Sequence, residues 1–195
     1  MTLTITQTLT ELQSCHAQSG RLEWLGIRPQ HRDDMVELDT AVLLIGQGIE
    51  GDHYAGKTVN GERQVTLIQA EHLPVIASLC GLATVYPAQL RRNLMISGIN
   101  IAVLKDQRFT LGATELEGTG YCHPCSRMEE NLGRGGYNAV RNHGGMTARV
   151  VTGSRIARDD RLTVIWPGEM HLPGFFKFWY IYCQYRYALI LLLIK

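Results

Sequence analysis

Residues 108–129 read RFTLGATELEGTGYCHPCSRME, a predicted hairpin followed at once by a cluster of reactive side chains. The runs 108–111 and 114–117 flank Gly112-Ala113, an arrangement typical of a β-hairpin. A Gly-x-Gly bend then leads to two thiols, an imidazole and a guanidinium within a few residues. The stretch therefore predicts antiparallel strands and, directly after them, a chemically active turn.

Further short strands are predicted on both sides of this hairpin. Apolar, β-branched or loosely alternating runs occur at 21–27, 36–45, 63–68, 95–103 (in two short pieces), 147–151 and 161–165. Twenty glycines in 195 residues, many at turn positions, favour a fold with many bends over a helical bundle. We therefore expect a mostly β, barrel-like fold with a few short helices.

Three segments are predicted to be helical. Apolar residues recur at three- and four-residue spacing in 69–80. Residues 87–94 begin with a proline, which suits the first turn of a helix. In 126–132, Ser126 is followed three residues later by Glu129, the spacing of a capping box.

The length and composition indicate one globular domain with its own core. Apolar residues make up 45% of the chain and charged residues 19%, and the formal net charge is +1. So small a net charge gives no overall attraction to nucleic acid or membrane, and we expect no nucleic-acid partner. We expect a tail at 1–20, one domain at 21–166 with a long glycine-rich loop at 46–61, and an extension at 167–195.

The end of this extension, 175–195, is aromatic and then aliphatic. A membrane-spanning helix needs about 20 apolar residues with few charges. Lys177, Gln184 and Arg186 interrupt the segment, so only 187–194 are continuously free of such side chains. We assign no function to the extension; contact with a membrane through it is the less favoured alternative.

Cysteine usage indicates a reducing compartment. The five cysteines are irregularly spaced, and residues 1–18 lack the basic and then apolar pattern of a secretory signal. We therefore expect a cytoplasmic protein whose cysteines are thiols rather than a disulfide framework.

Cys122 and Cys125 form a Cys-x-x-Cys pair that leaves several interpretations open. A structural zinc site would need two more ligands, and the sequence has no second pair at a typical ligand spacing. Both cysteines could instead be buried as small apolar residues. Alternatively, Cys125 is a reactive thiol just before a helix, where the helix dipole and Arg127 would stabilise its thiolate.

Basic and glycine-rich segments supply candidate ligands for an anion. Arg91, Arg92 and Asn93 combine forked guanidinium donors with an amide that can bind a planar ring edge. The glycine-rich residues 133–137 and 142–145 could offer backbone N–H groups as an anion nest. Taken alone, the basic residues or the glycine-rich segments could equally belong to a solvent-exposed surface without a ligand. Together they indicate a pocket for an anionic ligand with a thiophilic centre.

At these residues the chain resembles the MOSC domain, a family named for the C-terminal domain of molybdenum cofactor sulfurase. The resemblance covers about 21–165. Its segments are GIEGDHYAG (48–56), RQVTLI (63–68), LRRNL (90–94), SGIN (97–100), GTGYCHPCSRM (118–128) and HGGMTARV (143–150). It implies a β-barrel-type fold and a pocket for the molybdenum cofactor (Mo-molybdopterin) or a related sulfur species.

The resemblance also implies roles for individual residues. Cys125 matches the family's key cysteine, which is taken to ligate molybdenum or to carry a persulfide, whereas Cys122 has no such counterpart. For reduction of an N-hydroxylated substrate, we take His143 and Asp52 as our own candidates for proton delivery. The residues expected to hold the cofactor are basic or carry an amide: Arg63, Arg91, Arg92, Asn93 and Arg127. We expect no pyridoxal-phosphate desulfurase domain in this chain, and hence a separate cysteine desulfurase or electron-donor protein as partner.

Three functions follow from these expectations. The first is a small oxidoreductase that reduces N-hydroxylated compounds with the molybdenum cofactor. The second is a carrier of persulfide sulfur or of the cofactor, with no turnover of its own. The third is a thiol–disulfide module that uses Cys122 and Cys125 together.

Overall fold

The computed structural model describes residues 15–165. The predicted extension at 167–195, with its membrane alternative, lies outside the described residues, as does most of the predicted tail at 1–20. Within 15–165, none of the helices has both the length and the apolar character needed to cross a bilayer.

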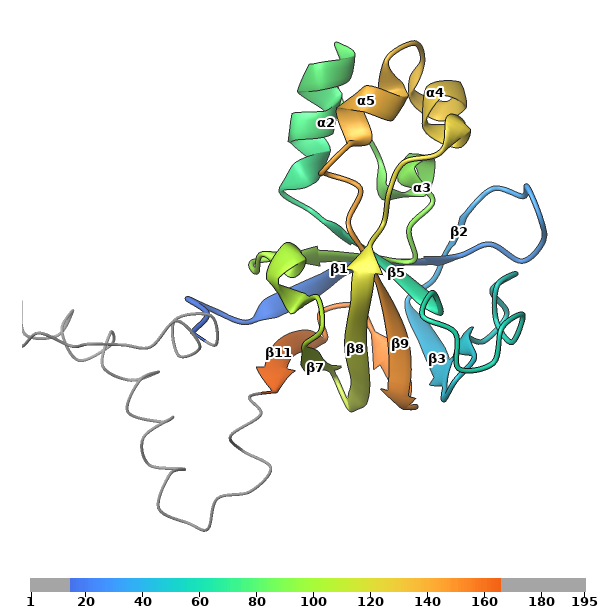
Figure 1. The fold of residues 1–195 in the computed structure, drawn as a ribbon, viewed down its shortest axis with the longest axis vertical. Helices are drawn as coiled ribbons and strands as arrows, with labels where there is room; N and C mark the ends of the chain where they lie inside the picture. Colours follow the sequence, from blue (N-terminus) through green and yellow to red (C-terminus); the bar gives the residue numbers. More distant parts are fainter. Residues whose placement is uncertain (1–14, 166–195) are drawn as a thin grey trace, which may run out of the picture. The chain divides into compact units, whose positions relative to one another are not determined.

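Seven strands close into a barrel, which confirms the predicted fold class (Figure 1). Neighbouring strands around it are β1 (Gly20–Ile27), β11 (Arg161–Ile165), β7 (Arg108–Leu111), β8 (Thr114–Tyr121), β9 (Met146–Thr152), β5 (Val65–Gln69) and β6 (Leu94–Ser97), and β6 pairs with β1 again. β5 and β6 run parallel, whereas β1 is antiparallel to both β6 and β11. The strands that the sequence predicts at 21–27, 63–68, 147–151 and 161–165 are therefore members of one barrel.

The predicted strand at 36–45 is in fact two strands with different partners. β2 (Val36–Glu37) pairs with β1, while β3 (Thr40–Leu44) lies between β4 (Gly48–Ile49) and β10 (Arg155–Ala157) in a small second sheet. The glycine-rich loop expected at 46–61 thus contains one short strand, β4, at its start.

The predicted hairpin is present and leads directly to the cysteines. β7 pairs with β8 from Arg108 opposite Glu117 to Leu111 opposite Thr114. Farther along β8, its register against β9 shifts between Gly118 and Gly120. A Cβ on Gly118 would overlap the carbonyl oxygen of Leu104, so only glycine fits at this irregularity.

The strand β5 is buried on both faces because the barrel core covers one face and helices cover the other. Leu67 belongs to the main cluster inside the barrel, and its neighbour Ile68 belongs to a second cluster beneath the helices. Both side chains are fully buried, a contribution of about 1.5–3 kcal/mol each.

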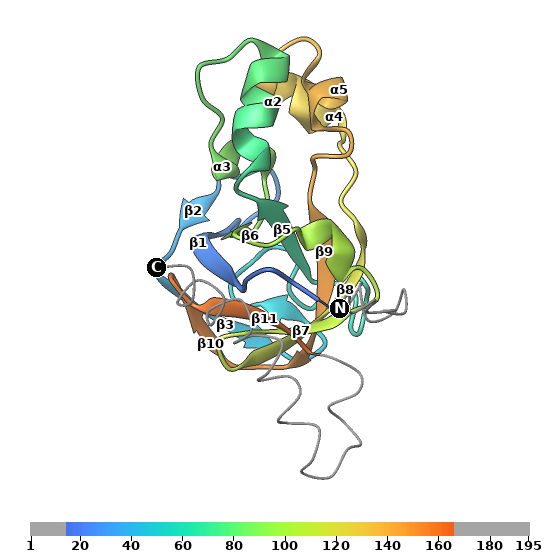
Figure 2. The ribbon, with the colours of Figure 1, turned by 90° about the vertical axis from the view of Figure 1, so that its left-hand side faces the viewer.

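The helices gather at one end of the barrel (Figures 1 and 2). They are α2 (His72–Cys80), α3 (Pro87–Leu90), α4 (Ser126–Leu132) and α5 (Gly136–Val140). The helix predicted at 87–94 ends early, because Arg91 adopts a left-handed conformation with φ of 56° and Leu94 starts β6. The second extended piece predicted within 95–103 is wrong, since Ile101–Leu104 form a 3-10 helix.

The predicted capping box of α4 is also wrong. Cys125, not Ser126, occupies the N-cap position, in extended conformation. The Glu129 carboxylate accepts hydrogen bonds from the backbone N–H groups of Gly135 (2.7 Å) and Tyr137 (2.9 Å). These bonds lower the pKa of Glu129. Glu129 therefore ties α4 to the start of α5 instead of capping its own helix.

Candidate functional site

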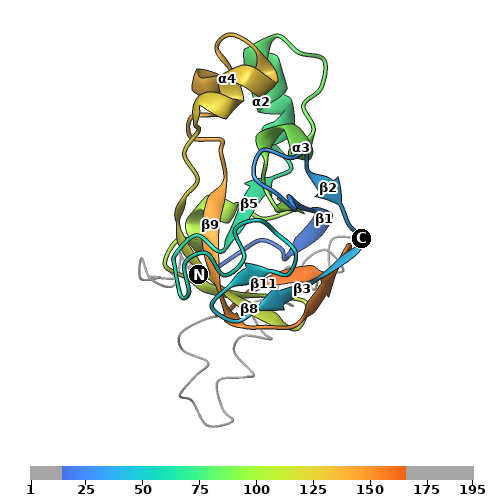
Figure 3. The ribbon, with the colours of Figure 1, turned by 90° about the vertical axis from the view of Figure 1, so that its right-hand side faces the viewer.

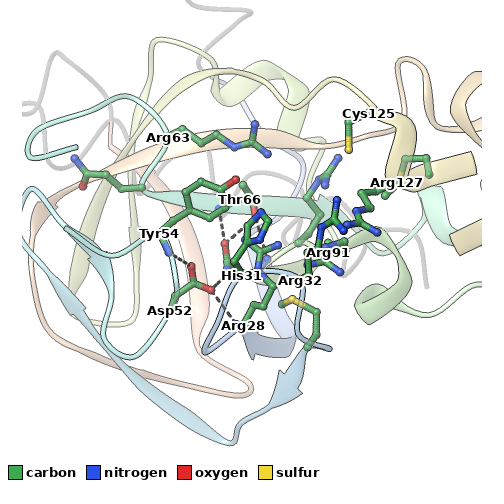
Figure 4. Close-up of a pocket in the computed structure, with 15 residues that line it drawn as sticks. Arg28, His31, Arg32, Asp52, Tyr54, Arg63, Thr66, Arg91, Cys125 and Arg127 are labelled. Atoms are coloured by element: carbon green, nitrogen blue, oxygen red, sulfur yellow. Dashed lines mark hydrogen bonds between the residues drawn. The ribbon is translucent and has the colours of Figure 1, made fainter. Parts of the chain in front are cut away.

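A cavity of about 190 Å³ lies where several loops meet at the helical end of the barrel (Figure 4). The loop 28–35 between β1 and β2 lies beside α3 on one side (Figure 3). Four further segments line the cavity. They are the loop after β4, the start of β5, the turn from α3 to β6, and the connection from β8 to α4.

Positive charge dominates the wall of this cavity. Six guanidinium groups line it, accompanied by a single lining carboxylate, that of Asp52; the arginines are Arg28, Arg32, Arg63, Arg91, Arg92 and Arg127. Within residues 15–165, Arg127 alone of the six forms an ion pair, with Glu130. The Nε atom of Arg28 is buried without a hydrogen-bond partner. Such a concentration of unpaired cations is stable only if an anion occupies the cavity or water screens it.

Arg91 reaches the cavity from the left-handed turn that ends α3. The turn reverses the chain at this point, so that the half-buried side chain points into the cavity. Burial, and after it the nearby charges of Arg28 and Arg127, lower the pKa of the Arg91 guanidinium. An anion bound in the cavity would offset the repulsion that Arg28 and Arg127 exert on Arg91.

Arg92 is buried, and much of its hydrogen-bonding capacity is used within the protein. Its Nε donates to the carbonyl of Gly144 over 2.7 Å, and Nη1 donates to the carbonyl of Leu90 over 2.6 Å. Burial is the main effect that lowers the pKa of this guanidinium. Arg92 thus fastens the segment 143–145 to the site while adding its charge to the cavity wall.

Asn93 and Asp52, both predicted site residues, are bonded to each other. Asn93 Nδ2 donates to Asp52 Oδ2 (3.1 Å) and to the carbonyl of Gly26 (3.2 Å). Its Oδ1 accepts from the backbone N–H and the hydroxyl of Thr66. Every donor and acceptor of this amide is occupied, so the side chain of Asn93 has no free group for a ligand. Asn93 instead holds Asp52 and Thr66 in place on the cavity wall.

The two cysteines of the Cys-x-x-Cys pair have different surroundings. Cys125 is exposed and lines the cavity (Figure 4). Cys122 is 3% exposed, and Arg63 Nη2 donates to its sulfur over 3.7 Å. Both are free thiols. Helix α4 therefore begins at an exposed sulfur that shares the cavity wall with the arginines, and the reactivity of Cys125 stays a prediction.

The remaining sequence-derived candidates lie apart from the cavity. His143 is not among the residues that line it; the ring packs edge-on against His72, with centroids 4.9 Å apart. The glycine-rich segment 133–137 cannot act as a free anion nest, because Glu129 already binds the N–H groups of Gly135 and Tyr137.

Sequence reasoning missed several residues of the cavity wall, among them Arg28, His31, Arg32 and Tyr54. The Tyr54 ring lies 5.1 Å from the Arg28 guanidinium carbon and 6.0 Å from that of Arg63, both cation–π distances. The sequence did indicate a basic loop here, since three basic side chains follow β1 within the five residues 28–32.

The barrel, its arginine-lined cavity and the exposed thiol define a class of small β-barrel domain with a strongly basic pocket. A sequence model of the MOSC domain matches residues 46–163, more than half of the chain. The protein therefore belongs to the MOSC domain family. A search of curated proteins found no match.

Solved structures share the fold. The YuaD protein from Bacillus subtilis is 19% identical, with a TM-score of 0.67 over 75% of this chain and 96% of that one. YiiM from Geobacillus stearothermophilus is 14% identical, with a TM-score of 0.62 over 76% of each chain. YiiM from Escherichia coli is 19% identical, with a TM-score of 0.57 over 75% of this chain and 70% of that one. At such identities the likeness establishes the fold alone.

Proposed function

We propose that this protein binds the molybdenum cofactor in the arginine-lined cavity, with Cys125 as the protein ligand of molybdenum. The observation that carries the proposal is an exposed thiol on the wall of a cavity that six guanidinium groups line. Membership of the MOSC family supports the same cofactor.

The residues present fit this cofactor in charge and in donor type. The phosphate of a pterin cofactor is a dianion, which guanidinium forks bind well, and the buried Nε of Arg28 lacks a partner. A thiolate is a soft ligand suited to molybdenum. Within the described range, no group of three or more His, Cys, Asp or Glu side chains could hold a metal ion. The remaining metal ligands would therefore come from the cofactor itself.

The wall residues divide into those that hold the anion and those that position them. Arg28, Arg63, Arg91 and Arg127 present guanidinium groups to the cavity. Asp52 accepts hydrogen bonds from the backbone N–H groups of Arg28 (3.0 Å) and Tyr54 (2.9 Å), and so orients the loops that carry them. We assign Arg92 and Asn93 to positioning, because their polar groups are largely bonded within the protein.

Reduction of an N-hydroxylated compound is the reaction that we propose for the loaded protein. The bound cofactor would supply the two-electron chemistry. The protein would orient it, screen its charge and deliver protons. His31 is the imidazole on the cavity wall, so we propose it for proton delivery in place of His143, with Asp52 as the carboxylate alternative.

Loading in a host that makes the cofactor tests the proposal. Molybdenum and pterin should copurify with the wild-type protein, and Cys125→Ser should lose the metal while keeping its fold. Cys80→Ser, which alters a half-buried cysteine outside the cavity, is the matched control and should load normally. Reduction of N-hydroxylated compounds by the loaded protein, with a reduced viologen as electron donor, then tests turnover. Absence of both molybdenum and pterin from the wild-type protein would overturn the proposal.

The exposure of Cys125 favours a second candidate function, that of a persulfide carrier. An exposed thiol is accessible to a separate cysteine desulfurase, which could transfer sulfur to it. Intact-mass measurement after incubation with a desulfurase and cysteine would show one added sulfur that a reductant removes. Cys125→Ser should acquire none, and sulfur on Cys125→Ser would exclude this function.

A further inference from the structure

The proposed cofactor site uses Cys125 and leaves Cys122 without a role. A buried cysteine can serve as a small apolar residue, but its sulfur then needs no charged partner. Cys122 has one, because Arg63 Nη2 donates to its sulfur, and Arg63 itself lines the cavity. A guanidinium next to sulfur stabilises the negative charge of an attacking thiolate. Arg63 thus places a cation directly between the Cys122 sulfur and the cavity wall.

Both cysteines also lie near the buried Arg92, which lines the cavity with Cys125 and is hydrogen-bonded to Gly144, itself packed against the Cys122 carbonyl. Burial lowers the pKa of Arg92, and the charges of Cys122 and Cys125 act in the opposite direction on that guanidinium. Arg92 is fixed by its bonds to Gly144 and Leu90. The two sulfurs consequently share one electropositive neighbourhood, although one is buried and the other exposed.

Backbone contacts fix Cys122, whereas the two residues between Cys122 and Cys125 are not held by backbone hydrogen bonds to the described part of the chain. Cys122 donates its N–H to the carbonyl of Gly145 over 2.9 Å, and a Cβ on Gly144 would overlap the Cys122 carbonyl. Within residues 15–165, His123 and Pro124 make no backbone hydrogen bond and belong to no helix or strand. The connection 123–124 is thus the part of the chain that would have to rearrange to bring the Cys125 sulfur to Cys122, while the carbonyl of Cys125 stays bonded to the N–H of Met128 at the start of α4.

We propose that Cys122 is the resolving thiol of Cys125, which makes the pair a reversible oxidation site in the cofactor-free protein. Hydrogen peroxide is the oxidant. The Cys125 thiolate attacks one peroxide oxygen, the O–O bond breaks, and Cys125 becomes a sulfenic acid as hydroxide leaves. The Cys122 thiolate then attacks the Cys125 sulfur, the S–O bond breaks, and a disulfide forms as a second hydroxide leaves. Overall, two thiols lose two electrons and two protons, and peroxide is reduced to two waters.

The disulfide would have a direct consequence for the cavity. Once the Cys125 sulfur is bonded to Cys122, it can no longer bind a metal or carry a persulfide, and a dithiol reductant would restore it. This inference concerns the protein without cofactor and does not depend on the proposed function. A protein that never binds molybdenum could still form the disulfide.

Peroxide treatment of the cofactor-free protein, followed by peptide mapping, tests the inference. The wild-type protein should lose the mass of two hydrogen atoms and yield a peptide that links Cys122 to Cys125, and dithiothreitol should reverse both changes. In Cys122→Ser, Cys125 should accumulate as a sulfenic acid that dimedone traps and then oxidise further. Cys80→Ser should behave as wild type.

A second variant tests the role of the guanidinium without removing a thiol. Arg63→Gln should slow disulfide closure about tenfold relative to sulfenic acid formation, because the attacking thiolate loses its cation. Arg63→Lys should retain most of the rate. The inference is overturned if wild-type Cys125 becomes overoxidised while Cys122 stays a free thiol, or if Cys122 pairs with any other cysteine.

Discussion

Asn93 donates a hydrogen bond to Asp52 over 3.1 Å and so joins two loops that are 41 residues apart in the sequence. Asp52 is the centre of this junction, since its carboxylate also accepts the backbone N–H groups of Arg28 and Tyr54. Two of its three donors belong to residues that carry a ring or a guanidinium to the cavity wall. The Asp52 carboxylate therefore stabilises the folded chain and also fixes the positions of Arg28 and Tyr54 in the cavity wall.

Replacing Asp52 with alanine should leave these donors without an acceptor. We expect Asp52→Ala to lower the free energy of unfolding by about 2–4 kcal/mol, because partly buried donors would lose charge-assisted bonds. Urea denaturation measures the loss. Glu50→Ala, at an exposed carboxylate in the same loop, is the matched control and should stay within about 0.5 kcal/mol of wild type. Equal stability of the two variants would contradict the central role of Asp52.

Gly145 follows Gly144, which Arg92 binds, and the backbone of Leu67 leaves no room for a side chain at this position. Gly145 has φ of 85°, and a Cβ there would overlap the backbone carbonyl of Leu67. We expect Gly145→Ala to cost more than about 3 kcal/mol, because strand β5 must shift. Gly81→Ala is the matched control, since Gly81 also has positive φ (67°) but open space around its Cα, and it should cost about 1 kcal/mol. Similar losses in thermal or urea unfolding of the two variants would refute the steric explanation.

The barrel was predictable from sequence because its signals are local. The hairpin 108–117 can be predicted from ten consecutive residues. The short alternating segments around it favour a β barrel over most other folds. The failures were also local. Glu129 has the spacing of a capping box, yet its carboxylate reaches forward to Gly135 and Tyr137. Spacing alone does not distinguish a glutamate that caps its own helix from one that binds the next helix, because the backbone N–H groups of both helices lie within reach of its carboxylate.

The site was only partly predictable, because it depends on contacts between distant segments. The sequence singled out Cys125 but left the burial of both cysteines open, and only the packing of Gly144 and Arg63 around Cys122 shows that this cysteine is the buried one. Likewise, the loop that carries Arg28 joins the cavity through tertiary contacts that no local pattern encodes. Sequence reasoning therefore assigned Cys125 and His143 to one site, whereas Cys125 lines the cavity and His143 packs against His72.

The packed pair of His72 and His143 should make stability depend on pH. Burial, followed by the charge of His143, lowers the pKa of His72 below its value in the unfolded chain, while hydrogen bonding to the His143 backbone and then the charge of Glu71 act in the opposite direction. Protonation therefore favours the unfolded state. The stability contribution is present above about pH 6.5 and is lost as the pH falls through the folded pKa.

We expect His72→Gln to flatten this decline in the free energy of unfolding below about pH 6.5. Urea titrations at several pH values measure the slope. Some slope should remain, because burial also lowers the pKa of His16. His123→Gln, at an exposed histidine in the loop before α4, should leave the slope of wild type unchanged. A slope in His72→Gln as steep as that of wild type would show that this histidine pair is not responsible.

Backbone strain and anion binding can be separated at Arg91. Its left-handed φ of 56° costs a non-glycine residue about 1 kcal/mol, whereas glycine adopts it freely. Arg91→Gly should therefore be about 1 kcal/mol more stable to urea than Arg91→Ala. Both variants lack the guanidinium and should bind inorganic pyrophosphate about tenfold more weakly than wild type, as measured by calorimetry on cofactor-free protein. If the two variants differ in pyrophosphate affinity as much as in stability, the conformation of the turn, and not the guanidinium, determines anion binding at this site.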